Sequence, residues 1–146
     1  MTPLNKKGTT IAVKKNGVLH HTLSEIIAAM GHTDMLVIGD AGLPIPKQTR
    51  RVDLALSPGI PGFIETVEAV LQELVVEQVI VADEMSEVSP AIYDRLQHSI
   101  GDVTVKRITH EQLKALCCDA VAVVRTGEFT PYANVVLVSG VAFGPK

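Results

Sequence analysis

Residues 31–46 read GHTDMLVIGDAGLPIP, and this stretch decides how the rest of the chain is interpreted. Its centre, 35–39, is a continuous apolar run too short for a helix of its own, so it predicts a strand covered on both faces. His32 precedes this strand and Asp40 follows it. Because a strand rises about 3.3 Å per residue, these side chains are expected at opposite ends of a segment of roughly 15 Å.

Helical and strand patterns alternate along the remaining sequence. The apolar positions of 23–30 have helical spacing, with Gly31 as the expected left-handed terminator. Residues 109–112 have the spacing of a capping box, and the Ser-Pro pair at 89–90 is typical of a helix start. We expect helices at 23–30, at 63–75, from 90 and from 109, and strands at 35–39, 52–56, 79–82, 103–108, 120–124 and 135–138.

This alternation predicts a three-layer α/β/α fold with a mostly parallel mixed sheet of about six strands. An antiparallel pair is expected where a loop joins the last two strands. Hydrophobic residues make up 47% of the 146 residues, which is enough for one buried core. We expect a single domain over residues 14–146 and an N-terminal extension over residues 1–13 that need not be ordered.

Composition excludes several classes of function. The formal net charge of -3 gives no general attraction for nucleic acid. Cys117 and Cys118 are adjacent, so they provide neither a disulfide framework nor zinc-site spacing, and a reducing cytoplasm fits best. No apolar run approaches the roughly 18 to 20 residues that span a bilayer, so we expect no membrane insertion.

Polar side chains gather where the expected strands end. Asp40 follows the first strand, Asp83 and Glu84 follow a later one, and 125–134 forms the last connection. Ligands of open α/β sheets bind outside the carboxyl ends of strands, so a site is expected there. Glycine-rich nucleotide loops, a serine-hydrolase elbow and metal-ligand spacings are all missing from the sequence. The histidines, carboxylates, amide and phenol that remain suit the binding of a polyhydroxylated molecule and proton transfer, without a metal.

Simpler structural roles stay open for these residues. His32 follows a helix end, where a histidine can cap carbonyls or favour the helix dipole. Asp40 can organise the following turn through its side chain, and Asp83 with Glu84 can cap the loop before the next helix. His110 is equally compatible with the first turn of a helix.

Three blocks of the sequence carry a resemblance to a known family. They are GHTD with DAGLPIP at 31–34 and 40–46, THEQ at 109–112, and RTGE with PYAN at 125–128 and 131–134. In this order and in a chain of this size, they resemble the ribose pyranase and fucose mutarotase family. The ribose branch is the nearer one, because fucose mutarotases typically carry a histidine after the Asp-Ala of the second motif.

The resemblance implies interconversion of the β-pyranose and β-furanose forms of D-ribose, without a cofactor, in support of ribose use. It assigns proton transfer to His32. Lys114, one helical turn beyond His110, either lines the same pocket or is a solvated surface lysine. The resemblance assigns sugar binding to Asp40, His110, Tyr132, Ala133 and Asn134.

The expected distance between His32 and Asp40 is too long for both side chains to contact one small sugar. Either the chain folds back, or another subunit completes each pocket. The family forms pentameric rings paired into decamers with shared sites, which favours the second explanation. Two other interpretations stay open: a non-catalytic ribose-binding or regulatory subunit, and a fucose-type mutarotase.

Overall fold

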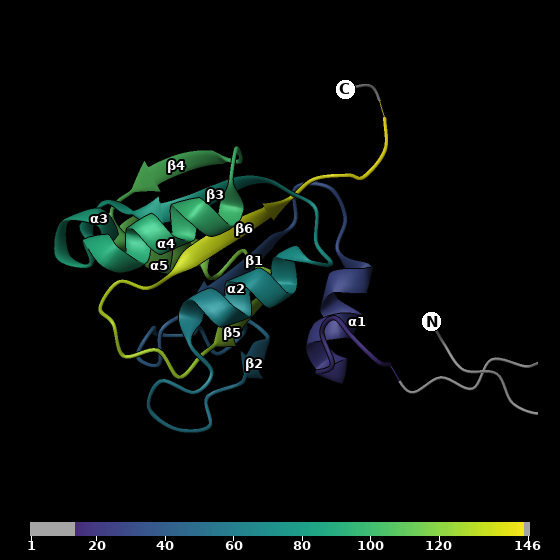
Figure 1. Cartoon of the computed structure of the whole chain (residues 1–146), viewed down its shortest axis with the longest axis horizontal. Coiled ribbons are helices and arrows are strands. Elements are labelled where there is room, and N and C mark those ends of the chain that lie inside the picture. The colour runs from purple at the N-terminus through teal and green to yellow at the C-terminus, as the bar shows by residue number, and fades with distance from the viewer. Residues whose placement is uncertain (1–13, 145–146) are drawn as a thin grey trace, which may run out of the picture.

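A six-stranded mixed sheet forms the centre of the protein in the computed structural model, which describes residues 14–144 (Figure 1). The strand order is β2-β5-β1-β6-β3-β4, and β6 alone runs against the other five strands. The predicted mostly parallel mixed sheet is therefore confirmed. The strands are β1 (Met35–Gly39), β2 (Arg51–Asp53), β3 (Val76–Ala82), β4 (Thr104–Ile108), β5 (Ala122–Arg125) and β6 (Val135–Ser139).

The antiparallel strand has different partners from those expected. β6 inserts between β1 and β3, so it does not pair with β5, the strand before it in the sequence. The prediction that the last two strands pair with each other is therefore wrong. The apolar sequence of β6 is compatible with an edge or a central strand, and its central place follows from burial on both faces.

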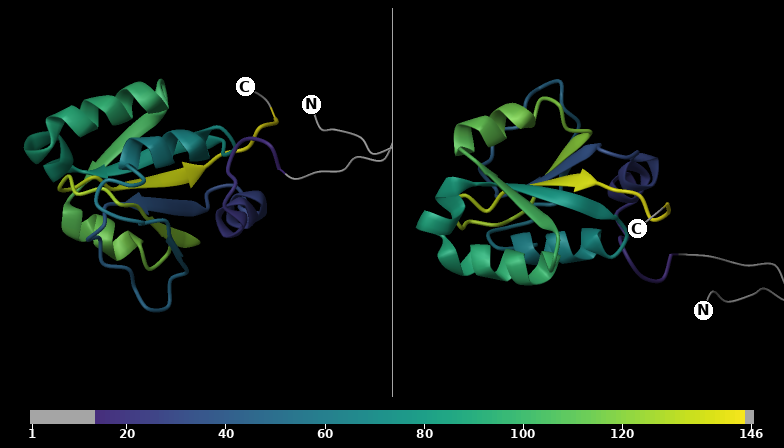
Figure 2. Two further views of the ribbon diagram at one scale, coloured as in Figure 1. Left: turned by 60° about the horizontal axis from the view of Figure 1, so that its bottom comes forward. Right: turned by 90° about the horizontal axis from the view of Figure 1, so that it is seen from above.

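Helices cover both faces of the sheet, which confirms the three-layer arrangement (Figure 2). Side chains of α1, α2 and α4 share one core cluster with one face of the sheet, and α5 contributes to the cluster on the other face. The helices are α1 (His21–Ala29), α2 (Phe63–Leu71), α3 (Asp83–Val88), α4 (Pro90–Ile100) and α5 (His110–Leu116).

β1 lies between the two clusters as the sequence predicts. Leu36 and Ile38 face the first cluster, Val37 faces the second, and all three are fully buried. Full burial of such a side chain contributes about 1.5–3 kcal/mol. β1 therefore anchors both cores and fixes the positions of the residues at its two ends.

Element boundaries differ from the sequence-based ones at several points. α1 ends at Ala29 and Met30 is extended, while the left-handed backbone occurs at Thr33 (φ 71°) and not at Gly31. α2 ends at Leu71, four residues before the end of its apolar pattern, although Leu74 remains buried. Helix α3 begins directly after β3, where a loop was expected.

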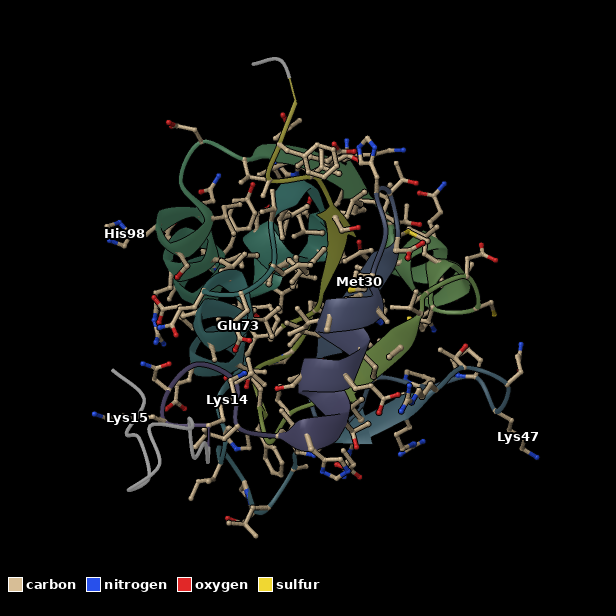
Figure 3. The ribbon with its side chains drawn as sticks, turned by 90° about the vertical axis from the view of Figure 1, so that its right-hand side faces the viewer. Lys14, Lys15, Met30, Lys47, Glu73 and His98 are labelled. Atoms are coloured by element: carbon tan, nitrogen blue, oxygen red, sulfur yellow. The ribbon has the colours of Figure 1, made fainter. Side chains whose placement is uncertain are left out.

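An ion pair and a hydrogen bond connect the beginning of the described chain to the segment that follows α2. Lys14 Nζ lies 2.9 Å from a carboxylate oxygen of Glu73, and Figure 3 shows the two side chains together. The other oxygen of Glu73 accepts a hydrogen bond from the Val18 amide. The Val18 and Lys14 hydrogen bonds hold the pKa of Glu73 below its usual value.

The expected N-terminal extension, residues 1–13, lies outside the described residues. Within residues 14–144, no helix combines the length and apolar character needed to cross a membrane.

Candidate functional site

Polar residues from four elements meet at the carboxyl end of the parallel strands. Asp40 follows β1, Glu84 lies in α3 just after β3, and His110 opens α5 just after β4. Asn134 immediately precedes β6, and because β6 is antiparallel, its first residue lies at this same edge. The position agrees with the general location of ligand sites in open α/β sheets.

Asp40 and Asn134 are joined by two hydrogen bonds. The Asp40 amide donates to Asn134 Oδ1 at 2.9 Å, and Asn134 Nδ2 donates to Asp40 Oδ2 at 3.2 Å. Gly39 makes this approach possible, since a Cβ there would lie 2.8 Å from Asn134 Oδ1 and 2.6 Å from Leu43 Cδ2. The amide of Asn134 is fully buried, so it holds the carboxylate in a defined orientation.

Asp40 also organises the following turn. Its Oδ1 accepts a hydrogen bond from the Gly42 amide at 2.9 Å, which is the turn-organising role that the sequence allows for it. Burial raises the pKa of Asp40 above its ordinary value, although the Gly42 amide, the Asn134 amide and the charge of His110 partly oppose that effect. The turn role and a ligand role are compatible, because a carboxylate has more acceptor sites than these bonds use.

His110 contacts Glu84 through its backbone amide and Tyr132 through its ring. Both carboxylate oxygens of Glu84 accept from the His110 amide, at 3.1 and 3.2 Å, and the predicted capping box of Thr109 is present. The imidazole meets the Tyr132 ring edge to face, with 5.0 Å between centroids. Its Nδ1 is buried and has no hydrogen-bond partner among the described residues. A buried polar atom of this kind normally has a partner, so His110 Nδ1 can still make one hydrogen bond, as acceptor or donor, with a water or a ligand.

The segment before β6 has an unusual backbone that presents these side chains. Tyr132 has a φ of 62°, and its carbonyl accepts from the Asn134 amide at 2.9 Å. Ser89 was predicted to cap α4, but its hydroxyl instead donates to the Pro131 carbonyl at 2.6 Å. The Ala133 side chain is buried in the core, so only its backbone is available to a ligand.

A hollow of about 430 Å³ opens beside Asp40. Arg125 borders it and donates from Nε to the Ala41 carbonyl at 3.0 Å, while its Nη1 pairs with Asp53 at 3.1 Å. The sequence did not identify Arg125 or Glu128 as site residues, although Arg125 is the last residue of β5 and Glu128 lies in the loop just after it. The hollow is lined by Asp40, Ala41, Gly42, Arg125, Glu128, Phe129, Thr130 and Pro131.

Glu128 has a structural part in this hollow. Its Oε1 accepts from the Phe63 amide at 2.9 Å, at the start of α2, and its Oε2 accepts from the Thr130 hydroxyl at 2.8 Å. Burial acts to raise the pKa of Glu128, but these hydrogen bonds outweigh it and hold the pKa below its usual value. Glu128 is thus an anion that ties the wall of the hollow to α2.

His32 lies at the other end of the sheet. The amide of its neighbour Thr33 donates to the carbonyl of Ser139, the last residue of β6, at 2.9 Å. Its Nε2 is 2.8 Å from Glu77 Oε2, and about half of the His32 side chain is exposed. A single chain therefore does not bring His32 to Asp40, and the chain does not fold back to do so.

Other candidates have partners outside the hollow. Lys114 Nζ pairs with Glu111 at 2.7 Å, and Arg107 Nε lies 3.3 Å from Asp83 Oδ1. Both cysteines are free thiols. Over residues 14–144, no group of three or more histidine, cysteine or acidic side chains has the arrangement of a metal site.

The fold and the site together define a small α/β protein with a hydrogen-bonding pocket at the carboxyl edge of its sheet. The chain belongs to the RbsD / FucU transport protein family, whose model matches residues 13–142. It is 53% identical over 131 residues to a D-ribose pyranase of Clostridium perfringens, covering 90% of this chain and all of that protein. It is 55% identical, with the same coverage, to a D-ribose pyranase of Chloroflexus aggregans.

Solved structures of this family also resemble the chain. The structure of Bacillus subtilis RbsD complexed with D-ribose matches with a TM-score of 0.87 and 44% identity, covering 90% of this chain and 100% of that one. FucU from Bifidobacterium longum matches with a TM-score of 0.74 at 23% identity, covering 84% of this chain and 96% of that one. The second likeness concerns the fold alone.

Proposed function

We propose that this protein is a D-ribose pyranase, a sugar isomerase that interconverts the β-pyranose and β-furanose forms of D-ribose without a cofactor. The observation that carries the proposal is the buried, unpartnered Nδ1 of His110 beside the locked pair of Asp40 and Asn134. The relatives named D-ribose pyranase and the ribose complex of the Bacillus subtilis relative support ribose as the sugar. They favour this function over a fucose-type mutarotase or a non-catalytic ribose binder.

The reaction requires only proton transfers. A base removes the proton of the anomeric hydroxyl while an acid protonates the ring oxygen, the bond between C1 and O5 breaks, and the open aldehyde forms. The C4 hydroxyl then adds to C1, loses its proton, and the carbonyl oxygen is protonated again. Each half needs one donor and one acceptor, a task suited to histidine near neutral pH.

We assign the proton transfer to His32 and the binding of the sugar hydroxyls to the Asp40 edge. Asp40 accepts hydrogen bonds, the His110 ring nitrogen contributes a polar contact, and the Tyr132 ring offers an apolar face. Asn134 orients Asp40, and Ala133, which lies between Tyr132 and Asn134 in the sequence, offers its backbone to the sugar.

Because these groups lie at opposite ends of the sheet, we propose that each site combines His32 of one subunit with the Asp40 edge of a neighbour. Exposed apolar side chains support this arrangement. A contact between the two opposite ends is heterologous, and such contacts form a ring when the rotation between neighbouring subunits closes. The apolar side chains near the Asp40 edge are Leu56, Ile60 and Phe129, and those near the His32 end are Val75, Val141 and Phe143.

We further propose that the rings are pentamers that pair into decamers, and that the protein acts in the cytoplasm on ribose destined for metabolism. The absence of a disulfide from the adjacent free cysteines is compatible with a reducing compartment.

Saturation-transfer NMR on D-ribose tests the function. Irradiation of a pyranose anomeric signal should transfer saturation to the furanose signal at a rate proportional to enzyme concentration. The His32→Ala protein should keep its fold and bind ribose but lose most of the exchange, and L-fucose should exchange more slowly than D-ribose. An unchanged exchange rate in His32→Ala contradicts the assigned role, and a preference for L-fucose contradicts the substrate.

A further inference from the structure

Glu77, at the start of β3, contacts the proposed catalytic histidine but has no role in the proposed function so far. Its Oε2 lies 2.8 Å from Nε2 of His32, although 45 positions separate the two residues in the sequence. We propose that Glu77 is a positioning residue that orients the imidazole of His32 toward the sugar; this inference rests on the proposed function of His32.

A β-bulge directs Glu77 to this position. On β3, Val76 pairs with Ser139 and Gln78 pairs with Val138, so Glu77 is an extra residue opposite a single step of β6. Figure 1 shows the start of β3 beside the end of β6. Bulges commonly re-aim a side chain next to a functional site.

The burial pattern shows what the bulge changes. Val79 and Val81 face the first core cluster, and regular alternation would direct Glu77 toward that same face. With the extra residue, Val76 packs against the cluster instead, and Glu77 is exposed at the end of the strand. Gly140 leaves room for this arrangement, since a Cβ there would lie 3.3 Å from Glu77 Cβ.

The turn that carries His32 is fixed independently. Asp34 Oδ2 accepts from the Gly31 amide at 2.8 Å, and the Ser139 hydroxyl donates to the Gly31 carbonyl. Thr33 has a φ of 71°, a backbone conformation uncommon for a β-branched residue. Strained backbone conformations cluster at functional sites, which supports a role for this turn in presenting His32.

The hydrogen bond assigns different tasks to the two ring nitrogens. With Nε2–H donated to the Glu77 carboxylate, Nδ1 carries the lone pair, and no second partner for the ring occurs within residues 14–144. Nδ1 is then the nitrogen that accepts and returns the proton of the sugar.

The test compares Glu77→Ala with Glu77→Gln, because a glutamine oxygen can still accept the Nε2–H bond. General acid–base catalysis contributes about 10²- to 10⁴-fold, so we expect Glu77→Ala to lower kcat on the order of tenfold with KM little changed. Glu77→Gln should retain more of the activity than Glu77→Ala. Glu68→Ala is the control, since this exposed glutamate also makes a side-chain hydrogen bond, to Ser99 at 3.2 Å.

A double-mutant cycle separates positioning from a general structural effect. In a His32→Ala background, Glu77→Ala should leave the residual exchange rate and ribose affinity unchanged, because Glu77 acts through His32. If His32→Ala is inactive while Glu77→Ala keeps the wild-type kcat, the inference about Glu77 is wrong and the proposed function stands. If His32→Ala keeps its activity, the role of His32 fails first.

Discussion

Asp40 and Asn134 hold each other through a reciprocal pair of hydrogen bonds across the boundary between β1 and β6. The two residues are 94 positions apart in the sequence, and they meet only because β6 inserts beside β1. The antiparallel strand therefore does more than complete the sheet. It delivers the amide that orients the carboxylate at the proposed sugar site.

Replacement of Asn134 by alanine should remove both ribose binding and part of the stability. The change leaves the Asp40 amide and Asp40 Oδ2 without their partners, while Oδ1 keeps the Gly42 amide, and such a loss costs about 1–3 kcal/mol for a buried group. The urea midpoint at fixed protein concentration and calorimetric titration with ribose measure the two effects. Gln97→Ala is the control, because Gln97 is an exposed amide that donates to Tyr93 at 3.2 Å. Equal ribose affinity in Asn134→Ala and the wild type would contradict the binding role of this pair.

Gly39, which directly precedes Asp40, and Gly42, which lies two residues after it, should respond differently to an added methyl group. In Gly39→Ala the Cβ would lie 2.8 Å from Asn134 Oδ1, so the amide must move, and overpacking of this kind costs about 1–3 kcal/mol. In Gly42→Ala the nearest atom is Asp40 Oδ1 at 3.7 Å, an ordinary contact. We expect Gly39→Ala to bind ribose at least tenfold more weakly and Gly42→Ala to bind nearly as the wild type does. Similar affinities for the two variants would show that the close approach at Gly39 is unimportant.

The pH dependence of ribose binding should report the burial of Asp40. Burial raises the pKa of this carboxyl above its ordinary value of 3.8, so on acidification Asp40 takes up a proton at a higher pH than an exposed aspartate does. A neutral carboxyl accepts weaker hydrogen bonds than a carboxylate, so ribose affinity should fall as the pH decreases through that raised pKa. Titrations of Asp40→Asn over the same range should lack this component. The same acid-side loss in both proteins would assign it to a group other than Asp40.

The adjacent thiols should differ strongly in reactivity. Burial, with a smaller contribution from Cys118, raises the pKa of Cys117 to about 11, whereas Cys118 is exposed. Because the thiolate is the reactive form, a disulfide reagent at pH 8 should modify Cys118 first and Cys117 only after unfolding. The Cys118→Ser protein should show no fast reaction in the native state. A fast reaction in that variant would contradict the burial of Cys117.

Periodicity and capping signals are sufficient to predict much of this fold. β1 has the bounds that its apolar run predicts, and the capping box at Thr109 forms as expected. Both signals are local, so each can be identified without knowing what packs against it. The pairing of β6 with β1 and β3 depends on contacts across the whole chain, and no local pattern encodes those partners.

The site is predictable only in part for the same reason. Asp40, His110 and Asn134 follow from strand ends and from the family resemblance, and the structure brings them together. The contact of Glu84 with the His110 amide needs α3, which lacks a clear helical pattern of its own. Glu77 gives no sequence signal, because the bulge that directs it to His32 depends on its register with β6.

The separation of His32 from the Asp40 edge leads to a test of the shared site. His32→Ala and His110→Ala should each be inactive as separate proteins, since each removes a different half of every site. When the two are unfolded and reassembled together, each contact draws its two halves at random, so about a quarter of the sites receive both wild-type contributions. Exchange activity should therefore return to roughly a quarter of the wild-type value. The His110 variant is preferred to an Asn134 variant because it leaves the hydrogen bonds between Asp40 and Asn134 intact.

Mass spectrometry on differently tagged chains must verify that mixed oligomers have formed. A parallel mixture of Asp40→Ala with His110→Ala is the control, because both changes affect the same edge of one subunit and no contact can restore a complete site. Recovery in the first mixture and not in the second is the expected result. If mixed oligomers form and neither mixture recovers activity, each site is built within a single chain. His32 must then act by a conformational change that carries it across the length of β1.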